Sequence, residues 1–382
     1  MLKSFYVKNF KNFRDGLTID FTNHGDYQFN TDCISNGIIS KMIIYGRNAT
    51  GKTNLGQALL DAYYTLSGRQ RFTDASSYLN ADTDNEVAEF CYTMQFGNDE
   101  VIYHYTKFSP TILAQEKLTI NSNTVFQIDF SKPEYYCDPK FVDLGDVVIQ
   151  RYIKEMKESD PEDIADDGQV SFFRWLISSI PFPEESPIEQ ASRFLRRISF
   201  LSNQNSRYYP SSYYSRFYES LVRNDKLDDF EDFLNSMGIP CKLAVQQTPD
   251  GQYQLYFVHN KLLPFVQAAS SGTLALTGLY LRIISNGLRF SILYFDEFDA
   301  FFHYEMAERL VQYFKRAYPQ IQIILTTHNT NLLTNHLMRP DCYYILSQSG
   351  QLTALRDATK RELREGHNLE KMYISGEFED YE

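Results

Sequence analysis

The stretch "IIYGRNATGKTNL", from Ile43 to Leu55, constrains the fold of this chain more than any other part of it. Residues 46–53 fit the pattern G-x-x-x-x-G-K-[ST] completely, after an apolar run suited to a buried strand and before apolar residues at helical spacing. The glycines let such a loop curl so that its backbone N–H groups point at phosphates. By composition alone, a match arises in a chain this long on the order of 1% of the time. The pattern predicts a phosphate loop within an α/β fold.

Two side chains of this loop carry specific chemistry. Lys52 would neutralise the β and γ oxygens of a nucleotide, and the Thr53 hydroxyl would ligate Mg²⁺. We expect the nucleotide to bind along the whole loop, at Gly46, Arg47, Asn48, Ala49, Thr50, Gly51, Lys52, Thr53 and Asn54.

Composition excludes several other classes of protein. The chain has 382 residues, of which 43% are hydrophobic, enough for two or three domains with a real core. No apolar run approaches 18 residues, and the first ten residues alternate like a strand, so we predict neither a membrane span nor a signal peptide. Five scattered cysteines, an odd count without metal-like spacing, indicate a reduced, cytoplasmic protein. The net charge of −12 disfavours nucleic acid overall, although local basic faces remain possible.

The order of patterns along the chain predicts a body split by an insertion. Residues 1–135 carry the phosphate loop and antiparallel strands, with turns near Asp15-Gly16 and at 97–99, and a further hairpin at 116–128. Residues 136–240 are mostly helical, in segments at 171–180, 187–201 and 226–238. An acidic piece at 154–167 is expected to be a solvated face or a mobile loop. Residues 241–382 return to strands and then alternate helix and strand.

A phosphate loop needs a second acid to position its metal, and "FSILYFDEFDAFFH" (290–303) offers one at the end of a hydrophobic strand. Asp296 would hold Mg²⁺ through water, and Glu297 is placed to polarise an attacking water, which indicates hydrolysis. One helix and one strand later, "IQIILTTHNTNLL" (321–333) ends its strand at His328, where an imidazole can contact a γ-phosphate and sense its loss. Two acids at a strand end and one structural histidine are the alternative interpretation.

These residues together resemble the ATPase heads of the ABC superfamily, and more closely the branch that includes SMC, RecF and OLD-type proteins. The opening "LKSFYVKNFKNFRD" is similar to that branch's first strand, and "DEFDAFFH" to its D-E-[hydrophobic]-D-x-x-[L/F]-H pattern. The resemblance implies an ABC-type P-loop NTPase head with a mixed sheet, split by a mostly helical insertion. It makes Asp299 the D-loop acid and places His303 after it on an interface, and it implies ATP and Mg²⁺ as cofactors.

The same family has a signature motif that is presented to the nucleotide of a second subunit. Here Ser270, Ser271, Gly272 and Thr273 would take the place of S-G-G-[E/Q], in a form that OLD-like relatives often show. An N-cap of the following helix is an alternative that does not exclude this role. The family's Q-loop glutamine is not identifiable, with Gln150 and Gln95 as candidates. The resemblance implies a head-to-tail homodimer, or a higher oligomer of such dimers, joined by ATP.

The insertion lacks the sustained heptads of a long coiled-coil arm, and about 50 residues follow His328 without the acids of a Toprim nuclease. The chain therefore looks most like the compact stand-alone ATPases of bacterial anti-phage systems of Septu, PARIS and abortive-infection type. That similarity implies a separately encoded effector, a nuclease or toxin, as a partner.

Two other functions stay open at this stage. One is a RecF-like DNA-binding clamp in repair, using the segments 193–197 and 207–218, which alternatively form helix surface and packed aromatics. The other is a scaffold in which ATP is structural and hardly turned over.

Overall fold

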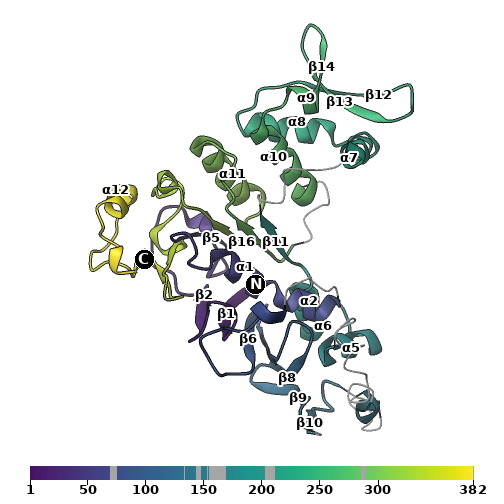
Figure 1. The fold of residues 1–382 in the computed structure, drawn as a ribbon, viewed down its shortest axis with the longest axis vertical. Coiled ribbons are helices and arrows are strands. Elements are labelled where there is room, and N and C mark those ends of the chain that lie inside the picture. The colour runs from purple at the N-terminus through teal and green to yellow at the C-terminus, as the bar shows by residue number, and fades with distance from the viewer. Residues whose placement is uncertain are drawn as a thin grey trace.

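The computed structural model describes residues 1–68, 75–132, 134–142, 148–152, 154, 169–202, 211–284 and 290–381. It shows an α/β fold in which one mostly parallel sheet and one antiparallel sheet lie next to each other, with helices around them (Figure 1). The predicted α/β class with a mixed sheet is confirmed.

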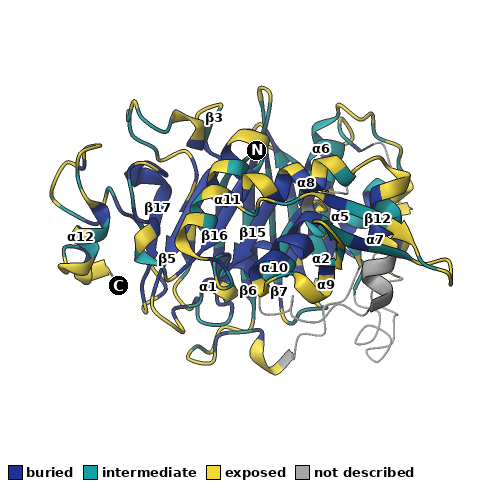
Figure 2. Ribbon diagram, turned by 90° about the horizontal axis from the view of Figure 1, so that it is seen from above, coloured by how far each residue is buried: buried dark blue, intermediate teal, exposed yellow. Residues whose placement is uncertain are grey.

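The six-stranded sheet holds the phosphate loop. Its first five strands are parallel and the last is antiparallel, in the order β11 (Ile198–Ser202), β15 (Ile292–Asp296), β16 (Gln322–Thr326), β5 (Lys41–Tyr45), β17 (Tyr343–Leu346) and β18 (Leu352–Ala354). Every residue of β5, β15, β16 and β17 is buried, as Figure 2 shows at the centre of the molecule. Burial on both faces explains why these strands read as continuous apolar runs in the sequence.

The seven-stranded sheet is antiparallel throughout. Its order is β10 (Tyr135–Cys137), β9 (Asn123–Asp129), β8 (Leu113–Ile120), β7 (Asp99–Lys107), β6 (Ala88–Phe96), β1 (Leu2–Lys8) and β2 (Leu17–Asp20). The three predicted turns are confirmed, since β1 pairs with β2, β6 with β7 and β8 with β9. Buried residues alternate with less buried ones along β6 and β7, as expected for a sheet with only one face in the core.

Helices cover these sheets and form a further lobe. Next to the phosphate loop are α1 (Lys52–Leu59) and α2 (Asp61–Ser67), with α5 (Phe172–Ser179) and α6 (Pro187–Leu195) against α2. The lobe at the top of Figure 1 contains α-helices and a small sheet. The helices are α7 (Ser211–Arg223), α8 (Leu227–Ser236), α9 (Phe265–Ala268) and α10 (Ser271–Leu279), and the strands are β12 (Leu243–Gln247), β13 (Tyr253–Val258) and β14 (Leu262–Pro264). The remaining strands and α-helices of the described residues are β3 (Ile34–Ser35), β4 (Ile38–Ile39), α11 (Tyr304–Ala317) and α12 (Leu369–Ile374).

One predicted helix is wrong in its second half. The sequence pattern predicts a helix over all of 187–201, but α6 ends at Leu195 and the chain turns into β11 at Ile198. β11 pairs in parallel with β15 along its whole length, so this tertiary pairing overrides the helical pattern. The mostly helical stretch therefore also supplies an edge strand of the central sheet. Of the acidic piece at 154–167, all but Lys154 lies outside the described residues, as do residues 207–210 of the aromatic segment.

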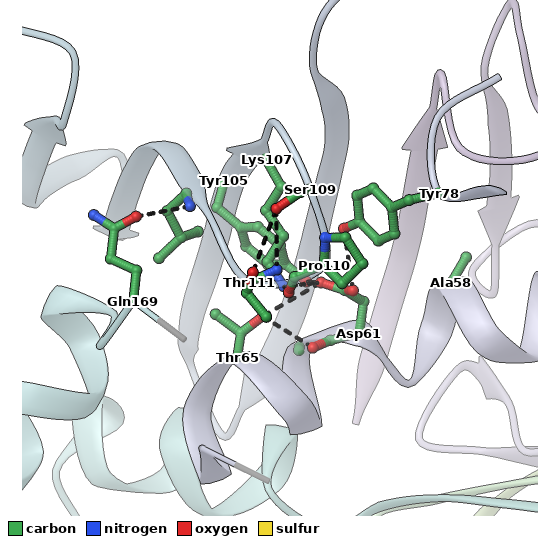
Figure 3. A network of polar contacts seen from close by, with 12 residues as sticks. Ala58, Asp61, Thr65, Tyr78, Tyr105, Lys107, Ser109, Pro110, Thr111 and Gln169 are labelled. Atoms are coloured by element: carbon green, nitrogen blue, oxygen red, sulfur yellow. Dashed lines mark hydrogen bonds and ion pairs between the residues drawn. The ribbon is translucent and has the colours of Figure 1, made fainter. Parts of the chain in front are cut away.

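One buried polar contact joins the two large sheets, and another joins a helix to the antiparallel sheet. The Gln322 side chain of β16 accepts a hydrogen bond from Leu2 N at 2.7 Å and donates one to Leu2 O at 2.9 Å, as a neighbouring strand would. At the start of α2, the carboxylate of Asp61 pairs with Lys107 Nζ of β7 at 2.8 Å and accepts hydrogen bonds from the hydroxyls of Tyr78 and Tyr105 (Figure 3). The second contact fixes the middle of the α1–α2 segment, where α2 begins, against the antiparallel sheet.

Within the part of the chain that the structure describes, no helix has both the length and the apolar character needed to cross a membrane.

The pair of Asp61 and Lys107 should dominate the stability of this junction. We expect Asp61→Ala to lower the free energy of unfolding by about 3–5 kcal/mol, because it leaves the Lys107 ammonium buried without its partner. The double variant Asp61→Ala, Lys107→Met should be more stable than the single one, since no unpaired charge then remains. Urea unfolding of both variants and the wild type measures this, and a double variant that is no better than the single one would contradict it.

Candidate nucleotide-binding site

The phosphate loop follows β5 and ends where α1 begins at Lys52. Its tight curl uses left-handed backbone at two positions, Gly51 with φ 101° and Ala49 with φ 66°. At Gly46, an added Cβ would lie 2.7 Å from the carbonyl oxygen of Leu346 in β17. The glycines are therefore needed for the close approach of the loop to its neighbours as well as for its conformation.

The Lys52 side chain lies back across the loop. Its ammonium donates hydrogen bonds to the carbonyl oxygens of Gly46 at 2.7 Å and Arg47 at 3.0 Å. Burial lowers the pKa of Lys52 to about 8, although the carboxylates of Asp296 and Glu297 act in the opposite direction. The loop thus holds this cation at its centre, positioned by carbonyl oxygens.

Asp296 lies at the end of β15 and is 1% exposed. Its two carboxylate oxygens accept hydrogen bonds from different elements, Oδ2 from the Thr53 hydroxyl of α1 at 2.7 Å and Oδ1 from the Thr326 hydroxyl of β16 at 2.8 Å. Burial raises the pKa of Asp296, against the effect of these two hydrogen bonds. The structure therefore brings together the two residues that the sequence assigned to a metal, Thr53 and Asp296.

This donor set fits Mg²⁺. A hydroxyl and a carboxylate are the hard oxygen ligands that Mg²⁺ takes, together with waters and substrate phosphates. Thr53 and Asp296 would hold the ion, which would neutralise charge on the phosphates when bound.

The two other predicted catalytic residues, Glu297 and His328, lie near Lys52, and the predicted nucleotide-binding residue Asp299 lies near His328. Glu297 is half-buried with φ 46°, and its backbone N–H donates to the Thr326 hydroxyl at 2.8 Å. His328 is exposed, and partial burial together with the charge of Lys52 lowers its pKa. Burial raises the pKa of Asp299, although the side chains of Thr327 and Asn329 donate hydrogen bonds to it and His328 favours its charged form.

The predicted signature segment forms the start of α10. Ser270 is the N-cap, and its hydroxyl accepts a hydrogen bond from Thr273 N at 3.1 Å. Ser271 is exposed, and Gly272 packs close to the chain after Asp299, since an added Cβ would lie 3.1 Å from the Phe301 carbonyl oxygen. The capping role is thus observed, and the role toward a second nucleotide stays a prediction. His303 is the exposed N-cap residue of α11.

Two residues that support the loop were missed from the sequence. The Asn12 amide, in the turn after β1, donates to Thr50 O at 3.0 Å and accepts from the Asn54 amide at 2.8 Å. The Tyr294 hydroxyl in β15 donates to Lys52 O at 2.5 Å. No local pattern marks either residue, because both contacts are long-range. Asn54, predicted to bind the nucleotide, uses its amide in this support.

The two glutamines predicted as Q-loop candidates lie on other parts of the chain. Gln95 is near the end of β6, and its amide donates to Gly97 O in the adjacent turn. The β1–β6 pairing puts Gln95 at the end of the strand away from Lys8 and hence from Asn12. Gln150 is exposed within 148–152. The assignment of the Q-loop glutamine therefore stays open.

The low pKa of Lys52 predicts a proton-linked nucleotide affinity. Near pH 8.5 the empty site holds Lys52 partly neutral, and bound phosphates would return it to the charged form. ATP binding should therefore take up a substantial fraction of one proton, and the affinity should fall as the pH rises above 8. Calorimetry in two buffers of different ionisation enthalpy measures the uptake.

Lys52→Ala is the control for that measurement. It should bind ATP about 10- to 100-fold more weakly, because a charge-assisted hydrogen bond to the phosphates is removed, and without the proton uptake. Uptake of equal size in this variant would assign the proton to another group.

Comparison with known proteins places the chain in a family. The family model described as "AAA domain, putative AbiEii toxin, Type IV TA system" matches residues 41–334, from the strand before the phosphate loop to just beyond His328. A search of curated proteins finds no match.

Solved structures that are similar include an SMC head bound to the C-terminal winged-helix domain of ScpA, at 16% identity and a TM-score of 0.44, covering 90% of this chain and 93% of that one. A Pyrococcus furiosus SMC head with an extended coiled coil, bound to the C-terminal domain of ScpA, has 14% identity, a TM-score of 0.45 and coverage of 92% and 96%. The Thermotoga maritima SMC head domain has 13% identity, a TM-score of 0.45 and coverage of 92% and 98%. Because the family model spans most of the chain, the protein belongs to this family of AAA-domain ATPases.

Proposed function

We propose that this protein binds and hydrolyses MgATP and uses the cycle as a switch. The observation that carries the proposal is the carboxylate of Asp296, which holds the Thr53 hydroxyl of the phosphate loop on one oxygen and Thr326 on the other. A nucleotide on this loop would meet the Lys52 ammonium, the metal-binding pair and the Glu297 carboxylate in one place. A site of this kind accelerates phosphoryl transfer by positioning the reacting groups and by electrostatic stabilisation.

Glu297 and His328 have different roles in the proposed hydrolysis. Glu297 directly follows the buried Asp296 and is half-buried, and in this proposal its carboxylate orients and polarises a water. His328 is exposed at the end of β16, beside the same charges, where its imidazole would contact the γ-phosphate and respond to its loss. The lowered pKa of His328 favours its neutral imidazole, which has one donor and one acceptor nitrogen.

Completion of the site by a second subunit is the next part of the proposal. Arg47, Asn48 and Ala49 at the tip of the loop are exposed, as is His328, so the site is open on one side. The start of α10 offers exposed Ser271 and backbone N–H groups that favour an anion. In a head-to-tail homodimer, the signature segment of each subunit would cover the nucleotide of the other. ATP would then hold the heads together and hydrolysis would release them.

The biological use is proposed from the resemblance to stand-alone anti-phage ATPases and is supported by the family's description, which refers to a toxin and a toxin–antitoxin system. In this proposal the ATP-joined dimer holds or releases a separately encoded nuclease or toxin on infection. This step rests on analogy between families.

Mixing two inactive variants tests the head-to-tail arrangement. Lys52→Ala removes the phosphate-loop cation, and Ser271→Arg puts a bulky cation at the exposed start of α10. Each alone should be inactive, but a heterodimer of the two has one site with both halves intact. We expect an equimolar mixture to regain about a quarter of the wild-type phosphate release, because about half of the dimers are mixed and each has one of two sites. No regain in a mixture that forms dimers would exclude shared sites.

The variant Glu297→Gln tests both hydrolysis and the effector. It should slow phosphate release by about 10²- to 10⁴-fold while keeping ATP affinity, because it removes only the general base. Light scattering should show a dimer that persists with ATP, and the tagged variant should be purified with ATP from cells that carry its neighbouring genes.

A stoichiometric nuclease or toxin in that preparation would support the switch. DNA without a protein partner would instead support the repair clamp. Turnover unchanged from the wild type would support a scaffold in which ATP is structural.

A further inference from the structure

A hollow away from the nucleotide site is lined by four arginines. It has a volume of about 670 Å³ and lies among α2, α5 and α6, with Tyr63 on its wall and the guanidinium-bearing residues Arg174, Arg193, Arg196 and Arg197 around it. A second hollow of about 270 Å³ shares Arg193 and Arg197 with the first and is lined further on by Phe96 and Phe290. Arg193 and Arg197 line both hollows and aromatic side chains line each of them, and we call the two hollows together the arginine groove.

The arginine groove is basic, whereas the chain as a whole is acidic. The protein has 49 acidic and 37 basic residues, yet the larger hollow has four arginines and one acid, Glu189. Glu189 lies 3.9 Å from Arg196, and Glu184 lies 3.8 Å from Arg193, so both ion pairs are long. Across both hollows, the four arginines face three glutamates, Glu184, Glu185 and Glu189, so the groove keeps a small excess of positive charge.

The fold holds these cations in place. Arg193 is in the last turn of α6, and Arg196 and Arg197 form the short link from α6 to β11, whose ends are fixed by the helix and by pairing with β15. Arg174 comes from α5 and packs on Gly68, where an added Cβ would lie 1.8 Å from Nη1. With Gly68 in left-handed backbone, the guanidinium has room only because this residue has no side chain.

The arginine groove is separate from the nucleotide site. Parallel pairing aligns Ile198 with Ile292, at the start of both strands, whereas Asp296 is at the end of β15, at the same edge of the sheet as the phosphate loop that follows β5. Arg196 and Arg197, which directly precede Ile198, are therefore at the opposite edge of the sheet from the loop. The α1–α2 segment spans the two edges, and Gly56 in its middle packs closely on Phe200 of β11 and Tyr294 of β15.

We infer that the arginine groove binds the phosphate groups of a nucleotide, either free or within a single strand of nucleic acid. Guanidinium groups match phosphate oxygens in pairs, and several on one wall track a chain of phosphates. The larger hollow has the size of a small-molecule site, so it admits one nucleotide unit but no duplex. Tyr63, Phe96 and Phe290 give bases a surface on which to stack, whatever their identity.

The test uses full-length protein with Lys52→Ala, which removes most binding at the phosphate loop. A fluorescein-labelled single-stranded oligothymidylate is titrated at several salt concentrations, with anisotropy as the readout. Adding Arg196→Glu and Arg197→Glu should weaken binding at least tenfold. It should also reduce the slope of log affinity against log salt by roughly 0.7 for each phosphate that the arginines no longer neutralise.

The matched control carries Arg361→Glu and Arg364→Glu, an equal change of charge at exposed arginines elsewhere. It should change the affinity less than about twofold, and all variants should melt at the parent temperature. Equal weakening in the two double variants would overturn the inference, because it would show a response to net charge alone.

Competition separates the two sources of phosphate. Displacement of the oligonucleotide by a stoichiometric amount of a mononucleotide identifies free nucleotide as the ligand, and weak displacement by mononucleotide but strong displacement by unlabelled oligonucleotide identifies a single strand. If the parent protein binds neither the oligonucleotide nor a labelled mononucleotide, the inference is wrong. These measurements do not depend on ATP hydrolysis or on dimer formation, so failure of this inference is distinguishable from failure of the proposed switch.

Discussion

The carboxylate of Asp296 is the contact on which the rest of this site depends. It is almost wholly buried, and its two oxygens hold hydroxyls from residues 243 positions before it and 30 positions after it in the chain. A buried carboxylate needs such donors, because removal from water without them is costly. The same hydrogen bonds fix the direction in which the carboxylate and Thr53 face the phosphate loop, and Thr326 passes the constraint on to the backbone of Glu297.

The nucleotide site is in turn held by contacts between the two large sheets. Gln322 is in the strand that carries Thr326 at its end, and it pairs with the backbone of Leu2 at the start of the antiparallel sheet. Asp61 ties the helix pair that begins at the phosphate loop to β7 through Lys107. Asn12 reaches the loop from the turn after β1. Movement of one sheet against the other would therefore disturb the loop. These contacts are a physical route between a bound nucleotide and the rest of the head.

The arginine groove lies at the far end of that route. Its cations come from α5, from the end of α6 and from the link to β11, and residues of α2 line it too, so a ligand there would contact the same α1–α2 segment that begins at Lys52. Gly56, packed between Phe200 and Tyr294, leaves little free space in that segment. The α1–α2 segment would thus move as a unit, since close-packed interiors do not absorb displacement locally.

The local patterns of the sequence determined the α/β class, the phosphate loop, the hairpins and the strand that ends at Asp296, because each depends on residues close together in the chain. Asp296, Glu297 and His328 were predicted near the loop, and the structure places them around it. The tertiary structure decided what depends on distant partners. β11 is a strand and not a helix because it pairs with β15, and Asn12, Tyr294 and the arginine groove acquire their positions from elements far apart in sequence. The periodicity of the sequence does not reveal such contacts, because side chains that lie in one site do not have to follow any regular spacing along the chain.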